Sequence, residues 1–439
     1  MVTVVPCVDA GAVRWDRPCI AILLGAPLNV QNLERTGIPY LSPHADIVIF
    51  DCQTWLGRSE AGKRHEVATW DPVLAVASAT DMEHALQRYR PDYALDFIGL
   101  GPLTPVLQRM LAAAGTRFVV QRSGNIPLPS LFSSLAWKLR TRRVVPRPPP
   151  ASAASSDVTS PAPSIFSRVR QKLTSAWALR RALRSPDIAL LAGSSSLNHF
   201  TRRARHILWV GSQDFHSFRR LSEQQSDRPV ASPYAVLIDD NIPYASDWAL
   251  LGLSAPVTPE LYYRAMRRLF TILEAQWGMP LVIAAHPSSR HDERVQQGFD
   301  GITLLHGCTA ELVRHAEAVV LHGSTAVSFA ALAQKPLLFL TSDELRVSDY
   351  GLYIEIMAKE FGLAPLNIDH LDSVPDLKSL SLSPDIHAKY LDRYVCRRGT
   401  SEPGPWAEFI SHIKCVAPLG SKNESDRHNQ LDAKQYENS

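Results

Sequence analysis

Short apolar runs alternate with helical patterns along most of the chain. In the first half the runs are apolar on both faces, and several end in Gly, Ser, Asn or Asp, which form tight turns. Such runs are typical of parallel strands that are covered by helices on both sides. We therefore predict strands in this half at 19–24, 46–52, 73–77, 93–98, 118–121 and 188–192.

The same alternation continues more clearly in the second half. A helix is predicted at 259–277, because Thr258 precedes it as an N-cap and Gly278 stops it. Shorter helices are predicted at 310–315 and 326–334. Strands that alternate with helices indicate a second α/β unit with a parallel sheet. Its predicted strands are 234–238, 281–285, 302–305, 318–321 and 336–340.

The length of 439 residues suits two domains, because a single core rarely grows that large. We place an N-terminal domain at 1–225 and a C-terminal domain at 230–418. An insert at about 144–164 is rich in Pro, Ser and Ala and is predicted to be a flexible linker, since it buries little apolar surface. The polar, aperiodic tail 420–439 is predicted to be disordered.

Two basic segments with aromatic residues flank this insert, at 131–143 and 165–184. A basic amphipathic helix of this kind favours contact with an anionic membrane surface, where each cation contributes about 1 kcal/mol. The alternative is a helix that packs on its own domain and leaves its basic face in water.

Composition narrows the functional classes. The net charge of +3 gives no support to nucleic-acid binding, and the chain has no recognised nucleic-acid module. The six cysteines lack zinc-ligand spacing and are expected to be buried free thiols. The chain contains no run of about 18 apolar residues, so no transmembrane helix is predicted. Residues 1–7 lack the Lys or Arg with which a secretory signal begins, so no such signal is predicted. We expect a cytoplasmic protein, peripheral at the inner face of the cytoplasmic membrane if the basic segments bind lipid.

Polar clusters follow three of the predicted strands of the second half. They are Asp239-Asp240, His286-Pro287 and Gly323-Ser324-Thr325. In open α/β sheets, ligands bind outside the carboxyl ends of the strands, so these clusters are expected at one rim. The third cluster opens a helix, where N–H groups and hydroxyls suit a nucleotide phosphate. Simple N-capping by Ser324 or Thr325 is the alternative.

The other two clusters suggest acid–base chemistry. Pro287 restricts His286 to an extended conformation, in which its imidazole can donate to a phosphate or act as a general acid. One carboxylate of Asp239 and Asp240 can deprotonate an acceptor hydroxyl as general base. The alternative for this pair is turn formation, because Asp-Asp-Asn-Ile-Pro is good turn chemistry. No third carboxylate at suitable spacing supports a metal site.

Two further residues are weaker candidates for the same site. Glu311 lies near the start of a predicted helix, where its carboxylate can reach ribose hydroxyls or can simply favour the first helical turn. His322 directly precedes the predicted phosphate loop.

Together these clusters resemble the motif series of bacterial sialyltransferases and related CMP-sugar transferases. The stretches that carry the resemblance are 284–287, 309–313, 322–325 and 335–339, which also look like proteins encoded in capsule and lipopolysaccharide clusters. The resemblance covers the second half of the folded chain and the first half only loosely. The chain departs from the family at Asn241, where Gly usually follows the acidic pair, and at Thr325, where Ser is commoner.

The resemblance implies an α/β fold of the GT-B type, in which two Rossmann-like domains with mostly parallel sheets face a cleft. It implies that Asp239 or Asp240 is the base and that His286 is a phosphate partner or acid. Ser324 and Thr325 would hold the donor phosphate, without a divalent metal.

The implied activity is transfer of a sugar, such as a nonulosonic acid or a Kdo-type sugar, from a CMP donor. The acceptor would be a saccharide or a lipid-linked saccharide of a growing surface polysaccharide, and the nucleotide sugar would be a substrate rather than a resident cofactor. Three alternatives stay open: a UDP- or GDP-sugar-dependent transferase, a sugar-nucleotide epimerase, and a non-catalytic assembly protein.

Overall fold

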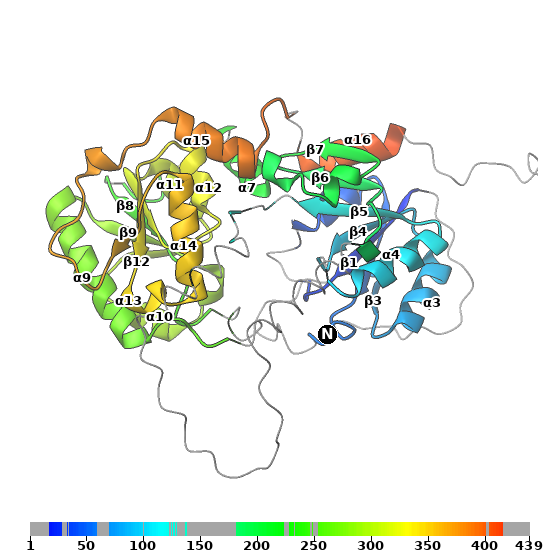
Figure 1. The fold of residues 1–439 in the computed structure, drawn as a ribbon, viewed down its shortest axis with the longest axis horizontal. Helices are drawn as coiled ribbons and strands as arrows, with labels where there is room; N and C mark the ends of the chain where they lie inside the picture. Colours follow the sequence, from blue (N-terminus) through cyan, green and yellow to red (C-terminus); the bar gives the residue numbers. More distant parts are fainter. Residues whose placement is uncertain are drawn as a thin grey trace, which may run out of the picture.

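The chain forms two α/β units, each built on its own parallel sheet (Figure 1). The computed structural model describes residues 17–28, 33, 35–58, 70–99, 101–122, 124, 126–127, 129, 137, 181–223, 228–231, 233–245, 248, 253–400 and 404–415. The predicted linker at about 144–164 and the tail 420–439 therefore lie outside the described residues. So do nearly all of segment 131–143 and most of segment 165–184.

The first sheet has the strand order β3-β2-β1-β4-β5-β6-β7, and every neighbouring pair is parallel. Its strands are β1 Cys19–Leu24, β2 Asp46–Asp51, β3 Val73–Ala75, β4 Tyr93–Phe97, β5 Arg117–Arg122, β6 Ile188–Leu191 and β7 His206–Trp209. The six predicted strands are confirmed. The seventh, the edge strand β7, was missed although residues 207–210 are apolar; its four residues are exposed or half-buried.

The second sheet has the order β10-β9-β8-β11-β12-β13 and is also parallel throughout. Its strands are β8 Ala235–Ile238, β9 Leu281–Ala285, β10 Leu304–His306, β11 Ala318–Leu321, β12 Leu337–Thr341 and β13 Leu366–Asn367. All five predicted strands are present, and only the two-residue edge strand β13 was missed. In each sheet the strand order reverses once, between β1 and β4 and between β8 and β11. These are the switch points at which such sheets bind ligands.

Helices cover both faces of both sheets, as Figure 1 shows. They are α2 Ile38–Leu41, α3 Ala79–Tyr89, α4 Thr104–Ala113, α7 Gln213–Glu223, α9 Pro259–Trp277, α10 Glu293–Gly298, α11 Thr309–His315, α12 Val327–Leu332, α13 Asp343–Arg346, α14 Asp349–Glu360, α15 Pro384–Tyr390 and α16 Pro405–Cys415. Helix α9 has the predicted bounds and ends at the left-handed Gly278 (φ 66°). Thr258 is its N-cap residue, but the Thr258 hydroxyl bonds to Glu344 instead of capping the helix.

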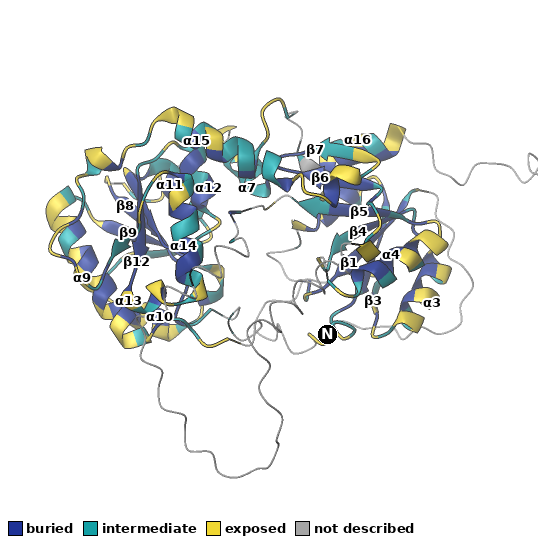
Figure 2. Ribbon diagram, viewed as in Figure 1, coloured by how far each residue is buried: buried dark blue, intermediate teal, exposed yellow. Residues whose placement is uncertain are grey.

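The central strands of both sheets are buried on both faces (Figure 2). In β1, Ala21 and Leu23 belong to one apolar cluster, whereas Ile20 and Ile22 on the opposite face belong to another. The strands of the second sheet divide between two clusters in the same way. Continuous burial explains why the strands are uniformly apolar in sequence and why their polar residues gather at the strand ends.

The chain crosses between the two units twice, near the predicted boundaries 1–225 and 230–418. Helix α7 precedes residue 225 but packs on α11 and α12 of the second unit. The last helix, α16, returns to the first unit, where Trp406 and Phe409 enter the apolar cluster that contains Ile20. Amphipathic helices follow an apolar surface rather than the order of the sequence, so periodicity alone did not assign them to a sheet.

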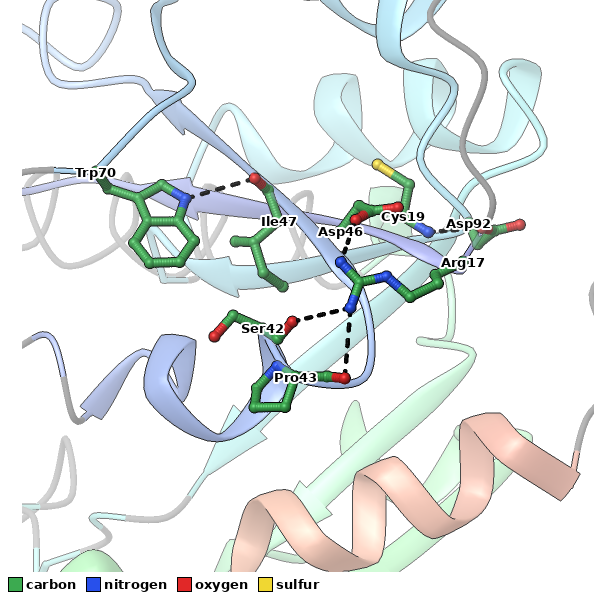
Figure 3. Close-up of polar contacts among 8 residues, drawn as sticks. All are labelled: Arg17, Cys19, Ser42, Pro43, Asp46, Ile47, Trp70 and Asp92. Atoms are coloured by element: carbon green, nitrogen blue, oxygen red, sulfur yellow. Dashed lines mark hydrogen bonds and ion pairs between the residues drawn. The ribbon is translucent and has the colours of Figure 1, made fainter.

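The amino-terminal edge of the first sheet is tied together by polar contacts (Figure 3). Arg17 forms an ion pair with Asp46 at 2.5 Å and donates to the Ser42 and Pro43 carbonyls. The Cys19 amide donates to Asp92 at the same edge. The carboxyl edge carries the less saturated groups described below.

Candidate functional site

The three polar clusters of the second half lie at one rim, the carboxyl edge of the second sheet. Strands β9, β8 and β11 are parallel neighbours in register, with Ile238 opposite both Ala284 and Leu321. Hydrogen bonds then join the clusters directly, from Asn241 to Ser288 at 3.1 Å and from Gly323 to Asp240 at 3.1 Å. Strand ends that are far apart in the chain thus form one connected polar rim.

Asp240 bridges the switch point of this sheet. Its Oδ2 atom accepts hydrogen bonds from the Gly323 amide at 3.1 Å and from the Tyr350 hydroxyl at 2.9 Å. The amide of Gly323, which was predicted to hold a donor phosphate, is therefore occupied by a carboxylate of the protein itself. Gly323 is required for a different reason, because a Cβ there would lie 2.8 Å from the ring of Tyr353.

Asp239 is 3% exposed and lies beneath the rim rather than on it. Its Oδ1 atom accepts from the Asn241 amide at 3.0 Å, whereas Oδ2 is buried with no hydrogen-bond partner among the described residues. Burial raises its pKa to about 7, and the nearby Asp240 charge adds to this, while the amides of Asn241 and His286 oppose it. A side chain so enclosed has no surface with which to touch an acceptor hydroxyl.

His286 is held in a single tautomer by a chain of hydrogen bonds. The Ser288 amide can only donate, and it points at His286 Nδ1 at 3.2 Å, so Nδ1 is an acceptor. The Ser288 hydroxyl accepts from Asn241 and lies 2.7 Å from the same nitrogen. The proton of the neutral ring is consequently on Nε2, which makes His286 a hydrogen-bond donor at that atom.

Asn241 explains one departure from the family pattern. Its φ is 49°, a left-handed conformation that Gly adopts freely and Asn tolerates better than other residues. The side chain also supplies the Nδ2 donor to Ser288, which Gly lacks. The backbone turn is therefore compatible with both residues, and only Asn extends the hydrogen-bond chain to His286.

Other predicted residues lie away from the rim surface. His322 is completely buried, its Nδ1 donates to the Leu340 carbonyl at 3.1 Å, and its Nε2 faces the Tyr262 hydroxyl at 3.2 Å. Burial lowers its pKa to about 4, so the ring is neutral and part of the core. Glu311 lines a separate cavity beside α7, and Pro287 is exposed next to His286. His322 and Glu311 therefore lie outside the site to which the sequence assigned them.

A cavity of about 480 Å³ lies between the two units. From the second unit it is lined by Thr325 and Ser328, next to the half-buried Ser324. From the first unit it is lined by residues after β4 and β5, the carboxyl ends of two central strands. The polar residues of its wall are Arg35, Asp96, Gln121, Arg122, Ser212, Gln213, Asp214, Thr325 and Ser328. Residues that follow β4 and β5 of the first sheet and β11 of the second therefore line one cavity, and the predicted cleft between two Rossmann-like domains is present. His286 and Asp240 lie on the second rim outside this lining.

Asp96 is the central carboxylate of this cavity. It lies at the end of β4, beside the switch point of the first sheet, and its Oδ1 accepts from the Ile98 amide at 2.9 Å and the Gly99 amide at 3.2 Å. Burial raises its pKa, while these two amides and the nearby Arg122 oppose the shift. Groups with perturbed pKa values in a cleft are typical of functional sites.

Asp214 is the second carboxylate of the cavity. It lies in the first turn of α7 and accepts a hydrogen bond from the hydroxyl of Ser328, and burial raises its pKa. Sequence reasoning missed both carboxylates. The strand-end rule, applied to the first half, selects Asp96 directly after the apolar run 93–95. Asp214 has no such signal, because it reaches the cavity only through the packing of α7.

Within the predicted membrane segments 131–143 and 165–184, Trp137 is the aromatic residue among the described positions. Trp137 is 4% exposed, and its indole N–H donates to the Ser348 carbonyl at 2.9 Å. This aromatic ring is therefore packed within the protein rather than presented to a membrane. In the part of the chain that the structure describes, no helix is long and apolar enough to cross a membrane. Within the same residues, no group of three or more His, Cys, Asp or Glu is placed to hold a metal ion.

No protein-family model and no curated protein matches the chain. Among solved structures it is similar to the glycosyltransferase of kitacinnamycin, at 12% identity and a TM-score of 0.47 over 91% of this chain and 99% of that one. It is similar to the UDP-GlcNAc 2-epimerase from Methanocaldococcus jannaschii, at 10% identity and a TM-score of 0.42 over 90% and 99%. It is also similar to the wall teichoic acid polymerase TagF, at 12% identity and a TM-score of 0.46 over 90% of this chain and 88% of that one.

Proposed function

We propose that the protein is a glycosyltransferase that moves a sugar from a nucleotide-activated donor onto a saccharide acceptor in the cavity between the two units. The observation that carries this proposal is that residues from the carboxyl edges of both parallel sheets line one cavity of about 480 Å³. Ligands of such sheets bind outside these edges, so two substrates can meet there.

Asp96 is the proposed general base. It lines the cavity at the end of β4, and its raised pKa suits proton transfer near neutral pH better than an ordinary carboxylate does. In the proposed step Asp96 takes the proton of an acceptor hydroxyl. The hydroxyl oxygen then bonds to the anomeric carbon while the bond from that carbon to the donor phosphate oxygen breaks. The nucleotide leaves with this electron pair.

The second unit is the proposed donor side. The Nε2–H of His286 and the hydroxyls of Ser324 and Thr325 are neutral donors suited to the phosphate oxygens on which charge develops as the nucleotide leaves. Asp240 and Asp239 are proposed as positioning residues rather than bases. Asp240 ties the Gly323 loop to Tyr350, and Asp239 supports the turn at Asn241.

The donor nucleotide is proposed to be CMP, with a nonulosonic acid or Kdo-type sugar, on the strength of the motif resemblance alone. A surface polysaccharide as acceptor rests on the same resemblance. A peripheral place at the inner face of the cytoplasmic membrane is proposed from the basic segments 131–143 and 165–184. UDP and GDP donors remain the alternatives, because His286, Ser324 and Thr325 contact phosphate rather than base in this proposal.

A thermal-shift series with CMP, UDP and GDP tests the donor side. A nucleotide at about 100 times its dissociation constant stabilises the folded state by roughly 2.7 kcal/mol. We expect CMP to raise the Tm, and His286→Gln to reduce that rise. If UDP or GDP raises the Tm and CMP does not, the CMP assignment is wrong. If none of the three does, the donor site itself is wrong.

A sugar-nucleotide epimerase is the second candidate, and the pair of cavity carboxylates favours it. Asp96 and Asp214 both line the cavity with raised pKa values, as an enzyme that moves a proton at a sugar carbon requires. Incubation with a UDP-N-acetylhexosamine in D2O, without acceptor, separates the two activities. An epimerase incorporates deuterium at the sugar ring, whereas a transferase does not.

A further inference from the structure

We infer that the acceptor of this cavity carries an anionic group, a carboxylate or a phosphate, which Arg35 and Arg122 bind. This inference rests on the proposed function and names the class of its acceptor. Both arginines line the cavity, one from the segment before α2 and the other from the end of β5. The first-unit wall, where the acceptor would lie, is thus the cationic wall.

Neither guanidinium is engaged by the part of the chain that the structure describes. Among the described residues, Arg35 and Arg122 donate no hydrogen bond and form no ion pair, although Arg122 is near enough to Asp96 to lower its pKa. Other arginines of the first unit are engaged: Arg117 donates to the Tyr93 hydroxyl at 2.6 Å and Arg17 pairs with Asp46. Two unengaged guanidiniums on one cavity wall indicate a ligand that supplies the acceptor oxygens.

Gln121 is an independent observation at the same place. It lines the cavity beside Arg122, and its Nε2 atom is buried with no hydrogen-bond partner among the described residues. A buried amide donor without a partner is unfavourable, and a ligand oxygen would satisfy it. The wall therefore offers an amide and two guanidiniums, all of them donors.

Asp96 offsets part of the charge of the nearby Arg122, but it is the one acidic residue among the described first-unit residues that line the cavity. Asp214, the other acidic lining residue, accepts from Ser328 on the side of the second unit. An anionic group bound by Arg35 and Arg122 would place the neighbouring acceptor hydroxyls beside Asp96. A neutral sugar would leave both guanidiniums without acceptors.

The test measures saccharide binding to the full chain by calorimetry, in the presence of the nucleotide that stabilises it. The probes are glucuronate for a carboxylate, glucose 1-phosphate for a phosphate, and methyl glucoside as the neutral sugar. We expect one of the two anions to bind at least tenfold more tightly than methyl glucoside. Arg35→Gln and Arg122→Gln should each remove roughly tenfold or more of that affinity. Arg109→Gln, an exposed arginine of α4 outside the cavity, is the control and should change nothing.

Three results would overturn the inference: equal binding of the neutral sugar, anion binding that both arginine variants retain, and no binding of either anion. A fourth would reassign it, because loss of nucleotide affinity in Arg122→Gln with unchanged anion binding would place the arginines on the donor. If no nucleotide stabilises the wild type while anions still bind through the arginines, the anion site stands and the proposed function fails.

Discussion

The two carboxyl rims differ in the kind of buried side-chain atom that lacks a hydrogen-bond partner among the described residues: the acceptors Asp239 Oδ2 and Asn241 Oδ1 at the second rim, and the donor Gln121 Nε2 at the first. At the second rim, the side chains of Asp240, Asn241, Ser288 and His286 are linked by hydrogen bonds to one another or to neighbouring backbone. At the first rim, the donors of Arg35, Gln121 and Arg122 have no partner among the described residues. The first rim has fewer motif residues, and its groups without partners are donors.

This difference suggests that the second rim positions the donor loop and that the first rim carries out the chemistry. A connected hydrogen-bond network holds a loop in one geometry, whereas donors without partners on a cavity wall can bind a ligand. The dense motif of the second rim therefore fixes the donor loop, and the sparse first rim supplies the base and the contacts to the acceptor. A change confined to one rim should therefore leave the role of the other rim intact.

The largest effect is expected from Asp96→Asn. Removal of a general base typically lowers turnover by about 10²- to 10⁴-fold, and the amide keeps an acceptor for Ile98 and Gly99. The measurement is transfer rate, together with nucleotide affinity and Tm, which should both be retained. The acid limb of the pH–rate profile should lie above the ordinary pKa of Asp, since burial raises that of Asp96.

Asp51→Asn is the matched control. Asp51 also ends a strand of the first sheet, but it pairs with Gln53 and does not line the cavity. If Asp51→Asn lowers transfer as much as Asp96→Asn does, the loss reflects the strand ends in general and the assignment of Asp96 is wrong.

The pH dependence of stability should identify Asp239. Its folded pKa of about 7 lies above the value of 3.8 for an ordinary Asp, so the folded state binds the proton more tightly. The stability from this group is present below pH 4 and is lost as the pH rises through 7, by about 4 kcal/mol as an upper bound. His322 acts in the opposite sense, because its pKa is lowered to about 4 and its stability is lost as the pH falls.

The contribution of Asp239 is separated from that of His322 by comparing the wild type with a variant that lacks the Asp239 carboxylate. The free energy of unfolding is measured with urea for wild type and Asp239→Asn between pH 4 and 7. As the pH rises, Asp239 should destabilise the wild type but not the variant, so the free energy of the variant should increase relative to that of the wild type. Parallel pH profiles for the two proteins would show that Asp239 is ionised throughout this range in the folded state.

Asp240→Ala should destabilise the second unit by roughly 2–3 kcal/mol, because the Gly323 amide and the Tyr350 hydroxyl lose their acceptor. Tyr350→Phe should cost about 1 kcal/mol, and Asp240→Asn less than Asp240→Ala. Chemical denaturation measures all three. A stable Asp240→Ala that has lost transfer activity would make Asp240 a catalytic base instead of a positioning residue.

His286→Gln should weaken nucleotide binding by roughly tenfold, the cost of one neutral hydrogen bond to phosphate. Ser288→Ala should have a smaller effect of the same sign, because it removes the hydroxyl beside Nδ1 and leaves the Ser288 amide in place. Calorimetric titration with the stabilising nucleotide provides the comparison. An unchanged dissociation constant in His286→Gln would exclude the phosphate contact.

The smallest effect is expected from Glu311→Gln. Glu311 lines a cavity with Ser217 and Arg220, away from both rims, so turnover and nucleotide affinity should stay within about twofold. A loss of nucleotide affinity in this variant would restore Glu311 to the donor site.

The sequence predicts the fold better than the site for a physical reason. Central strands such as β1 and β9 are buried on both faces, so their apolar runs mark their bounds. The strand-end rule likewise found Asp240 and His286. It cannot distinguish a carboxylate that is already hydrogen bonded from one that faces a cavity, because that depends on residues such as Gly323 and Tyr350 far along the chain.

Contacts between the units lie further beyond sequence patterns. Asp214 reaches the cavity because α7 packs on the second unit, and α16 returns to the first. His322 looks available in sequence and is enclosed only by Tyr262 and the strand carbonyl of Leu340. Such placements follow from tertiary packing rather than from local periodicity.

Hydrogen exchange of the full chain with and without the stabilising nucleotide tests the division between the two rims most directly. The account predicts slowed exchange in peptides that cover 286–289 and 321–328 of the second unit, with little change at 94–99 and 117–122. Protection confined to the first-unit peptides would contradict it, because the donor would then lie on the rim assigned here to the base and the acceptor.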